Sequence, residues 1–184
     1  MDDKLMMKSD PYRLVVEDLG RIGKLHIPEN WQEISSKPTP EWAQISYSRD
    51  FSPPNAPEAT LSIYFRGFLI SESSAQRFLE LLQEAPHKLS NQEINSINQV
   101  LSRIADEEAF ALRDIATINL GGRRLLIIDG EWKTSQTQFH GLMVTADETG
   151  REIQEIFFEA PASSFMKYLN EVTDSIETIE WKGL

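Results

Sequence analysis

The chain has 184 residues, of which 18 are Lys or Arg and 29 are Asp or Glu, giving a formal net charge of −11. This balance excludes the broad basic face that nucleic-acid phosphates require, so no nucleic-acid partner is expected. The absence of cysteine excludes disulfides, thiolate zinc sites and cysteine nucleophiles. With 40% apolar and 26% charged residues, the composition is typical of one ordinary globular domain.

The N-terminus has no apolar run of signal-peptide length, and no stretch approaches the roughly 20 apolar residues of a membrane span. We therefore expect a soluble, cytoplasmic protein without membrane insertion. A lumenal or periplasmic location is expected instead if a leader has been removed. Residues 1–11 are expected to form a flexible N-terminus, and residues 12–184 a single domain.

The first half of the chain predicts strands separated by turn residues. Short β-rich runs occur at 13–16, 21–27 and 31–34. Apolar and polar residues then alternate at 42–48 and at 61–66, which is the pattern of a half-buried strand. The segment between these two, Asp50 to Pro57, holds three prolines and is expected to be a loop.

Two helices are predicted in the middle of the chain. Ser73 or Ser74 is expected to cap a helix that runs to Ala85. Ser90 and Glu93 have the spacing of a capping box, in which the serine and the glutamate each bond to the other's backbone. Apolar residues recur every three or four positions after this box, so a second helix with one buried face is predicted; they are Ile94, Ile97, Leu101 and Ile104.

The last third predicts a hairpin whose second strand is apolar on both faces. A two-residue turn at Gly121-Gly122 places Leu120 opposite Arg123 and Ile118 opposite Leu125. A strand that is apolar on both faces needs cover on both sides. The hairpin is therefore expected in the middle layer of a sandwich of helices around a sheet.

A second hairpin, also apolar on both faces, and a closing helix follow. Residues 138–147 are expected to pair with 151–159, so that Asp147 and Arg151 form a cross-strand ion pair. Pro161 then opens a helix with one apolar stripe, which is expected to lie across the sheet; the stripe contains Phe165, Tyr168, Leu169, Val172 and Ile176.

The order of these elements resembles a known superfamily. The resemblance is carried by the turn Pro28-Glu29-Asn30-Trp31, the strand entry at 121–124, and Ala160-Pro161 before a final Phe-x-x-Tyr helix. From Tyr12 to Trp181 the chain looks like the Mog/PsbP-like superfamily, which includes Ran-binding Mog proteins, PsbP proteins of photosystem II and DcrB-like proteins. The resemblance implies an α+β fold, an α/β/α sandwich with a central antiparallel sheet. It also implies proteins that bind other proteins and mostly do not catalyse.

We therefore expect a non-enzymatic protein-binding module with an unidentified protein partner and no cofactor. The resemblance leaves two alternatives open. One is a PsbP-type accessory protein of photosystem II, and the other is a DcrB-like cytoplasmic chaperone for secreted effectors.

The sequence contains no constellation typical of catalysis or metal binding. There is no nucleophile elbow and no phosphate-binding loop. No two of the three histidines have the spacing that a metal site favours. His140 is expected on a packed face of its strand, and His87 in the turn between the two predicted helices. No catalytic, cofactor-binding or metal-binding residue is therefore predicted.

Large aromatic residues are the remaining candidates for a functional role. Trp31 and Trp132 are expected in the core. Trp42 and Trp181 are expected to be exposed, and exposed aromatic residues often anchor protein interfaces. Together with Phe51, from the proline-rich segment, these two are the candidate partner-binding residues.

Overall fold

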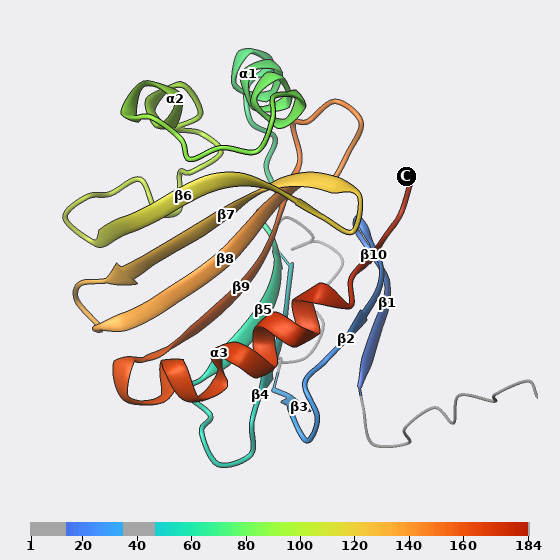
Figure 1. Ribbon diagram of the computed structural model, residues 1–184, viewed down its shortest axis with the longest axis vertical. Coiled ribbons are helices and arrows are strands. Elements are labelled where there is room, and N and C mark those ends of the chain that lie inside the picture. Colours follow the sequence, from blue (N-terminus) through green and yellow to red (C-terminus); the bar gives the residue numbers. More distant parts are fainter. Residues whose placement is uncertain (1–13, 35–46, 184) are drawn as a thin grey trace, which may run out of the picture.

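In residues 14–34 and 47–183, which the computed structural model describes, the chain forms two antiparallel sheets and three helices (Figure 1). The large sheet has the strand order β3-β4-β5-β9-β8-β7-β6, and the small sheet has the order β1-β2-β10. In chain order the elements are β1 (Val15–Leu19), β2 (Ile22–His26), β3 (Gln32–Glu33), β4 (Tyr47–Ser52), β5 (Thr60–Phe65), α1 (Glu72–Gln83), α2 (Asn91–Ser96), β6 (Phe110–Leu120), β7 (Arg123–Trp132), β8 (Thr137–Thr145), β9 (Ile153–Pro161), α3 (Ala162–Glu177) and β10 (Glu180–Trp181).

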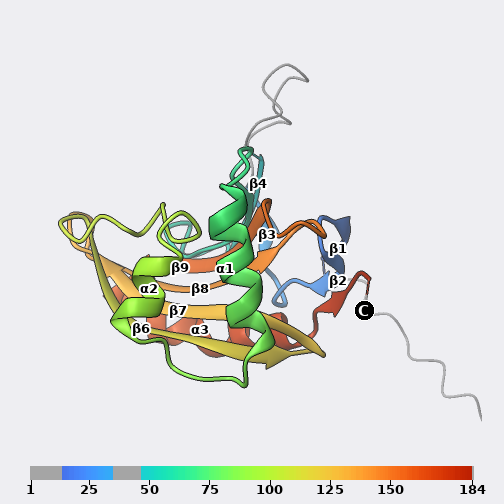
Figure 2. The same cartoon turned by 90° about the horizontal axis from the view of Figure 1, so that it is seen from above.

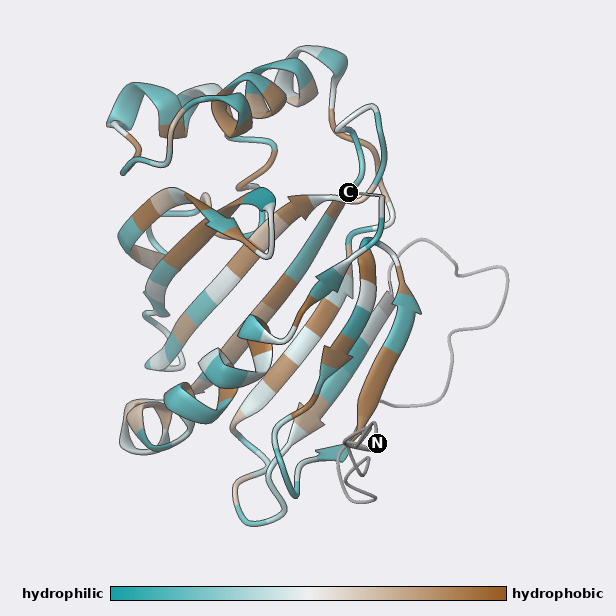
Figure 3. Cartoon of the chain, turned by 45° about the vertical axis from the view of Figure 1, so that its right-hand side comes forward, coloured by the Kyte–Doolittle hydropathy of each residue, from teal (hydrophilic) through white to brown (hydrophobic). Residues whose placement is uncertain are grey.

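The large sheet is the middle layer of three. Helix α3 lies on one face, and α1 and α2 lie on the opposite face (Figure 2). Each face has its own buried apolar cluster, one under α3 and the small sheet and the other under α1 and α2. Apolar bands alternate with more polar ones along the strands, and the helices also carry both apolar and polar residues (Figure 3). The expected α/β/α sandwich with a central antiparallel sheet is confirmed.

The two hairpins have the predicted register. Leu120 pairs with Arg123 and Ile118 with Leu125 around the two-glycine turn. In the second hairpin, Leu142 pairs with Ile156. Its residues alternate between the two clusters as expected: Leu142, Val144, Ile156 and Phe158 face α3, whereas Phe139, Met143, Ile153 and Phe157 face α1 and α2.

The expected ion pair between Asp147 and Arg151 does not form. Asp147 instead caps the turn, because its Oδ1 accepts a hydrogen bond from the backbone N–H of Glu152 at 3.0 Å. The Arg151 side chain points to the loop before α1, where its Nε donates to the Ile70 carbonyl at 3.0 Å. The turn and this loop therefore hold each other in place.

Helix α1 begins two or three residues earlier than predicted, and it ends at Gln83 instead of Ala85. Its cap is Ser71, whose Oγ accepts from the backbone N–H of Ser74 at 3.2 Å. The serine run at 71–74 offers several caps, and the sequence alone does not decide among them.

The second predicted helix is much shorter than its apolar pattern indicates. The capping box of Ser90 and Glu93 is present, but α2 ends at Ser96, and residues 97–104 form successive turns. Arg66 explains the difference, because its guanidinium donates to the carbonyl oxygens of Gln99 and Val100. Both carbonyls would accept helical hydrogen bonds if the helix continued. Ile97, Leu101 and Ile104 are still buried and Ile94 is partly buried, so the pattern predicted the buried face correctly and the helix length wrongly.

The expected loop from Asp50 to Pro57 is wrong in its first three residues. Asp50, Phe51 and Ser52 belong to β4, where Phe51 pairs with Leu61 and with Glu33. The prolines begin only at Pro53, so the strand continues until the backbone loses its N–H donors. Residues 1–13 lie outside the described residues, as does most of the strand predicted at 42–48.

Candidate functional site

The loop between α1 and α2 is fixed to the edge of the large sheet. The Leu89 N–H donates to the Ile115 carbonyl at 3.0 Å, and the Thr117 N–H donates to the His87 carbonyl at 2.9 Å. Since β6 is an edge strand, these bonds occupy part of its free edge. They also hold the backbone of His87 in one position.

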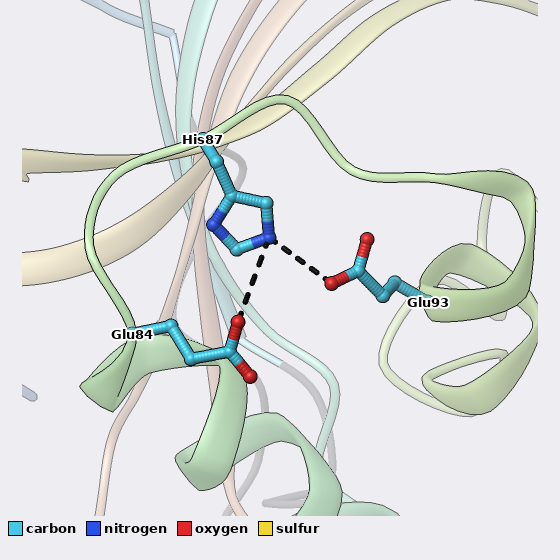
Figure 4. A group of neighbouring side chains, drawn as sticks. All are labelled: Glu84, His87 and Glu93. Atoms are coloured by element: carbon cyan, nitrogen blue, oxygen red, sulfur yellow. Dashed lines mark hydrogen bonds and ion pairs between the residues drawn. The ribbon is translucent and has the colours of Figure 1, made fainter.

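The His87 ring lies between two carboxylates, one from the end of α1 and one from α2 (Figure 4). Its Nε2 is 3.1 Å from Glu93 Oε1 and 3.9 Å from Glu84 Oε2. Its Nδ1 is 2.8 Å from the Ala85 carbonyl oxygen. A carbonyl only accepts hydrogen bonds, so Nδ1 carries a proton and Nε2 is the nitrogen that faces the carboxylates.

The second carboxylate is held as firmly as the ring. Glu93 Oε2 accepts from the backbone N–H and from the Oγ of Ser90, both at 2.7 Å. These two bonds leave Oε1 directed at His87. The Glu84 side chain is 49% exposed, so it is the least enclosed member of the three.

The electrostatics of this cluster favour positive charge at its centre. Hydrogen bonds from the Ser90 side chain and backbone lower the pKa of Glu93 to about 2. The bond to the Ala85 carbonyl and the bond with Glu93 raise the pKa of His87. The potential ligand atoms of Glu84, His87 and Glu93 all lie within 4.8 Å of one another. Within residues 14–34 and 47–183, they are the group of His, Asp and Glu residues with the spacing to hold a metal ion.

The sequence did not predict this cluster, although it placed His87 correctly between the helices. The three histidines are too far apart in the chain for their spacing to indicate a metal site. The useful signal was the pair of carboxylates that flank one histidine, at Glu84 and in the capping box. His140 offers less, since its Nδ1 meets one carboxylate, Asp129 Oδ1 at 2.7 Å, and its side chain is only 13% exposed.

A groove lies beside the same helix. We call it the α2–β6 groove; it has a volume of about 390 Å³ and is lined by Ile94, Asn95, Asn98, Leu101, Ile104, Ala105, Glu107, Phe110, Ala111, Leu112 and Lys133. Its floor is made of Leu101, Ile104 and Phe110, which are buried in the core under α1 and α2. Its outer wall includes Leu112, an apolar residue of the edge strand that is 37% exposed.

Acidic residues form one part of the rim of the α2–β6 groove, namely the lining residue Glu107 and its neighbours in the chain. Asp106, Glu107 and Glu108 are exposed in the turn before β6. The Asp106 carboxylate accepts from the Glu108 N–H at 2.9 Å, which fixes this turn. Lys133 is the cation of the lining, and its Nζ already donates to the Glu107 carbonyl oxygen. An apolar floor with a negative rim is therefore available at this end of the sheet.

The aromatic residues predicted to bind a partner are not brought together on a surface. Phe51 is fully buried. Trp181 is 8% exposed, and its Nε1 donates to the Leu120 carbonyl at 2.8 Å, so the exposure expected for it is wrong. The reason is that β10 adds to the small sheet and turns Trp181 into the cluster under α3. Trp42 lies outside the described residues.

Of the two tryptophans expected in the core, Trp31 is buried and Trp132 is partly buried. In the described part of the chain, no helix is both long and apolar enough to cross a membrane.

Comparison with known proteins identifies the fold. No family model and no curated protein matches the sequence. The structure is similar to the solution structure of cyanobacterial PsbP (CyanoP) from Synechocystis sp. PCC 6803, with a TM-score of 0.53 and 7% identity over 95% of each chain. The chain has the PsbP-like fold. A protein of unknown function from Pseudomonas aeruginosa, PA94, aligns with a TM-score of 0.49 and 14% identity over 94% of this chain and 99% of the other.

The PsbP-like fold accounts for the layers of the chain but not for its chemistry. At 7% identity the likeness extends to architecture alone. The role of the protein must therefore be argued from its own groove and its own side chains.

Proposed function

We propose that this chain is a non-enzymatic protein-binding module, and that the α2–β6 groove receives an apolar segment of a partner protein that carries basic residues beside its apolar anchors. The groove itself is the observation that carries the proposal. Its volume of about 390 Å³ is at the lower end of the roughly 300–1,000 Å³ of sites that hold a ligand or side-chain anchors.

The lining of the groove supports binding rather than catalysis. It contains seven apolar side chains of Ile, Leu, Phe and Ala types around Asn95 and Asn98, together with Glu107 and Lys133. None of the lining residues bears a hydroxyl, thiol or imidazole group, so the groove contains no hydroxyl or thiol nucleophile paired with an imidazole base. Its polar groups are suited to fixing the direction of a bound segment.

The charge of the rim indicates which residues of the partner segment would flank its apolar anchors. Asp106, Glu107 and Glu108 are exposed, and the lining cation Lys133 is already bonded to the Glu107 carbonyl. The whole chain also has a net charge of −11. Lys or Arg next to the anchors of a partner would gain from this field, whereas Asp or Glu would be repelled.

A pair of labelled peptides tests this proposal by fluorescence anisotropy. One 12-residue peptide has Leu anchors separated by Lys, and the other has the same anchors separated by Glu. The Lys peptide is expected to bind at least about 10-fold more tightly, and its advantage should shrink as salt screens the rim. Equal affinities for the two peptides would contradict the proposed role of the rim.

Matched variants locate the binding. Leu112→Ser removes an apolar side chain from the outer wall of the groove without changing the charge of the rim; the side chain is already 37% exposed, so the fold should tolerate the change. Met166→Ser is the control, because Met166 is 70% exposed on α3, across the sheet. Leu112→Ser is expected to weaken binding of the Lys peptide at least about 10-fold, or about 1.4 kcal/mol, and Met166→Ser to leave it unchanged. Unchanged binding by Leu112→Ser would place the peptide elsewhere and overturn the proposal.

A further inference from the structure

We propose that Glu84, His87 and Glu93 form a binding site for a divalent transition-metal ion of the zinc class, with His87 Nε2 and one oxygen of each carboxylate as ligands. The proposal does not depend on protein binding in the α2–β6 groove. It rests on the spacing of the three ligand atoms, on the groups that orient them, and on their chemistry.

The spacing is close to that of a tetrahedral site. Zinc–ligand distances of about 2.0–2.1 Å place neighbouring N and O ligands about 3.3 Å apart. His87 Nε2 and Glu93 Oε1 are 3.1 Å apart, so these two atoms need almost no movement. Glu84 Oε2 is 3.9 Å from Nε2 and must approach to about 3.3 Å. Its exposed side chain, at the C-cap of α1, has the freedom to do so.

The two close ligands are oriented by groups behind them, as in known metal sites. The proton of His87 Nδ1 is bonded to the Ala85 carbonyl, which fixes the tautomer that leaves Nε2 free to bind a metal. The backbone N–H of His87 also donates to Thr117 Oγ1 at 3.0 Å. Glu93 is held through its other oxygen by Ser90. The site is therefore preorganised by contacts that do not use the ligand atoms themselves.

The ligand set selects the class of metal. Neutral imidazole with two carboxylates suits zinc and its neighbours, whereas Ca²⁺ requires six or more oxygen ligands and Mg²⁺ a near-ideal octahedron. Two carboxylates also neutralise a divalent ion. Three protein ligands leave the fourth tetrahedral position open to water or to a group from a partner. A proton on His87 Nε2 would compete with the metal, because it would form a hydrogen bond between the ring and Glu93.

Calorimetric titration of the full chain with Zn²⁺ distinguishes the metal from the proton. We expect one zinc ion per chain, and no comparable binding of Mg²⁺ or Ca²⁺. His87→Ala keeps the backbone bonds to Thr117 but removes the ring, and it is expected to weaken zinc binding at least about 10-fold. His140→Ala, which removes a histidine paired with one carboxylate, is the matched control and should bind zinc as the wild type does.

The variant Glu84→Gln distinguishes a loss of zinc binding from a loss of folding. The Glu84 side chain is 49% exposed, so the variant should unfold at the wild-type temperature without metal while binding zinc at least about 10-fold more weakly. Zinc should raise the midpoint of thermal unfolding in the wild type and in His140→Ala, but not in His87→Ala. No zinc binding by the wild type, or equal binding by His87→Ala and the wild type, would overturn the proposal.

Discussion

Arg66→Met is expected to lower the free energy of unfolding by about 3–5 kcal/mol, because it breaks a buried ion pair from one side. Arg66 Nε donates to Glu155 Oε1 at 2.6 Å, and the two side chains are 2% and 1% exposed. Removing the guanidinium leaves a carboxylate in the core without its main counter-charge. Methionine fills similar space without charge, so most of the loss comes from the pair itself rather than from a cavity.

The same guanidinium also holds the irregular segment 97–104. Its Nη1 donates to the Gln99 carbonyl at 2.9 Å, and its Nη2 to the Val100 carbonyl. A buried carbonyl that loses its donor costs about 1–3 kcal/mol. Arg103 limits the damage, since its Nε also donates to Glu155, at 3.0 Å. These opposing effects keep the expected loss at about 3–5 kcal/mol rather than at the sum of all the broken bonds.

Urea unfolding at pH 7 measures this loss, with the slope of the transition checked for a change in the unfolded state. The double variant Arg66→Met, Glu155→Leu should be less destabilised than the sum of its two single variants, because it removes both buried charges together. A loss below about 1.5 kcal/mol for Arg66→Met would refute the reasoning. It would mean that the pair contributes little more than a surface ion pair does.

Two further predictions concern the sheet and its turns. Burial raises the pKa of Glu159 above its ordinary value of 4.5. The folded chain therefore binds the proton of this carboxyl group more tightly than the unfolded chain does. The free energy of unfolding then falls as pH rises through the raised pKa. Glu159→Gln should remove this fall, so its stability relative to the wild type should increase between about pH 4 and 7. The free energy of unfolding is measured by urea at several pH values, and a difference between the two proteins that stays constant across that range would contradict the prediction. Gly121 has a φ of +56°, and an added Cβ would lie 3.2 Å from the Ile179 carbonyl oxygen. Gly121→Ala is therefore expected to cost about 1–2 kcal/mol by thermal unfolding, and an unchanged midpoint would show that the turn adapts.

The sequence predicted those parts of the fold that are decided by neighbouring residues. The registers of both hairpins follow from a short turn and a period of two, and both are confirmed. The capping box of Ser90 and Glu93 is equally local and is present. Local chemistry thus determined the middle layer of the sandwich and the start of each helix within a few residues.

The failures arise where a distant group competes for the same backbone or surface. The helix expected to reach Ile104 ends at Ser96 because Arg66, about 30 residues earlier, donates hydrogen bonds to the carbonyl oxygens of the following segment. Trp181 is buried because the Leu120 carbonyl, 61 residues away, accepts its indole N–H. Glu84, His87 and Glu93 come together because backbone hydrogen bonds to β6 fix the loop that carries His87. None of these partners can be identified from the spacing of residues along the chain.

Helix α2 belongs to both the groove and the ligand cluster, and this links the two proposals without merging them. With six residues it is too short to be stable alone, so its position depends on its cap and on packing. Glu93 supplies both that cap and a ligand oxygen, and the next residue, Ile94, lines the groove. A metal ion on Glu93 would restrict α2 and with it this wall of the groove. Any resulting gain in affinity for a bound segment must be matched by an equal gain in affinity for the metal, because coupling between two binding sites is reciprocal.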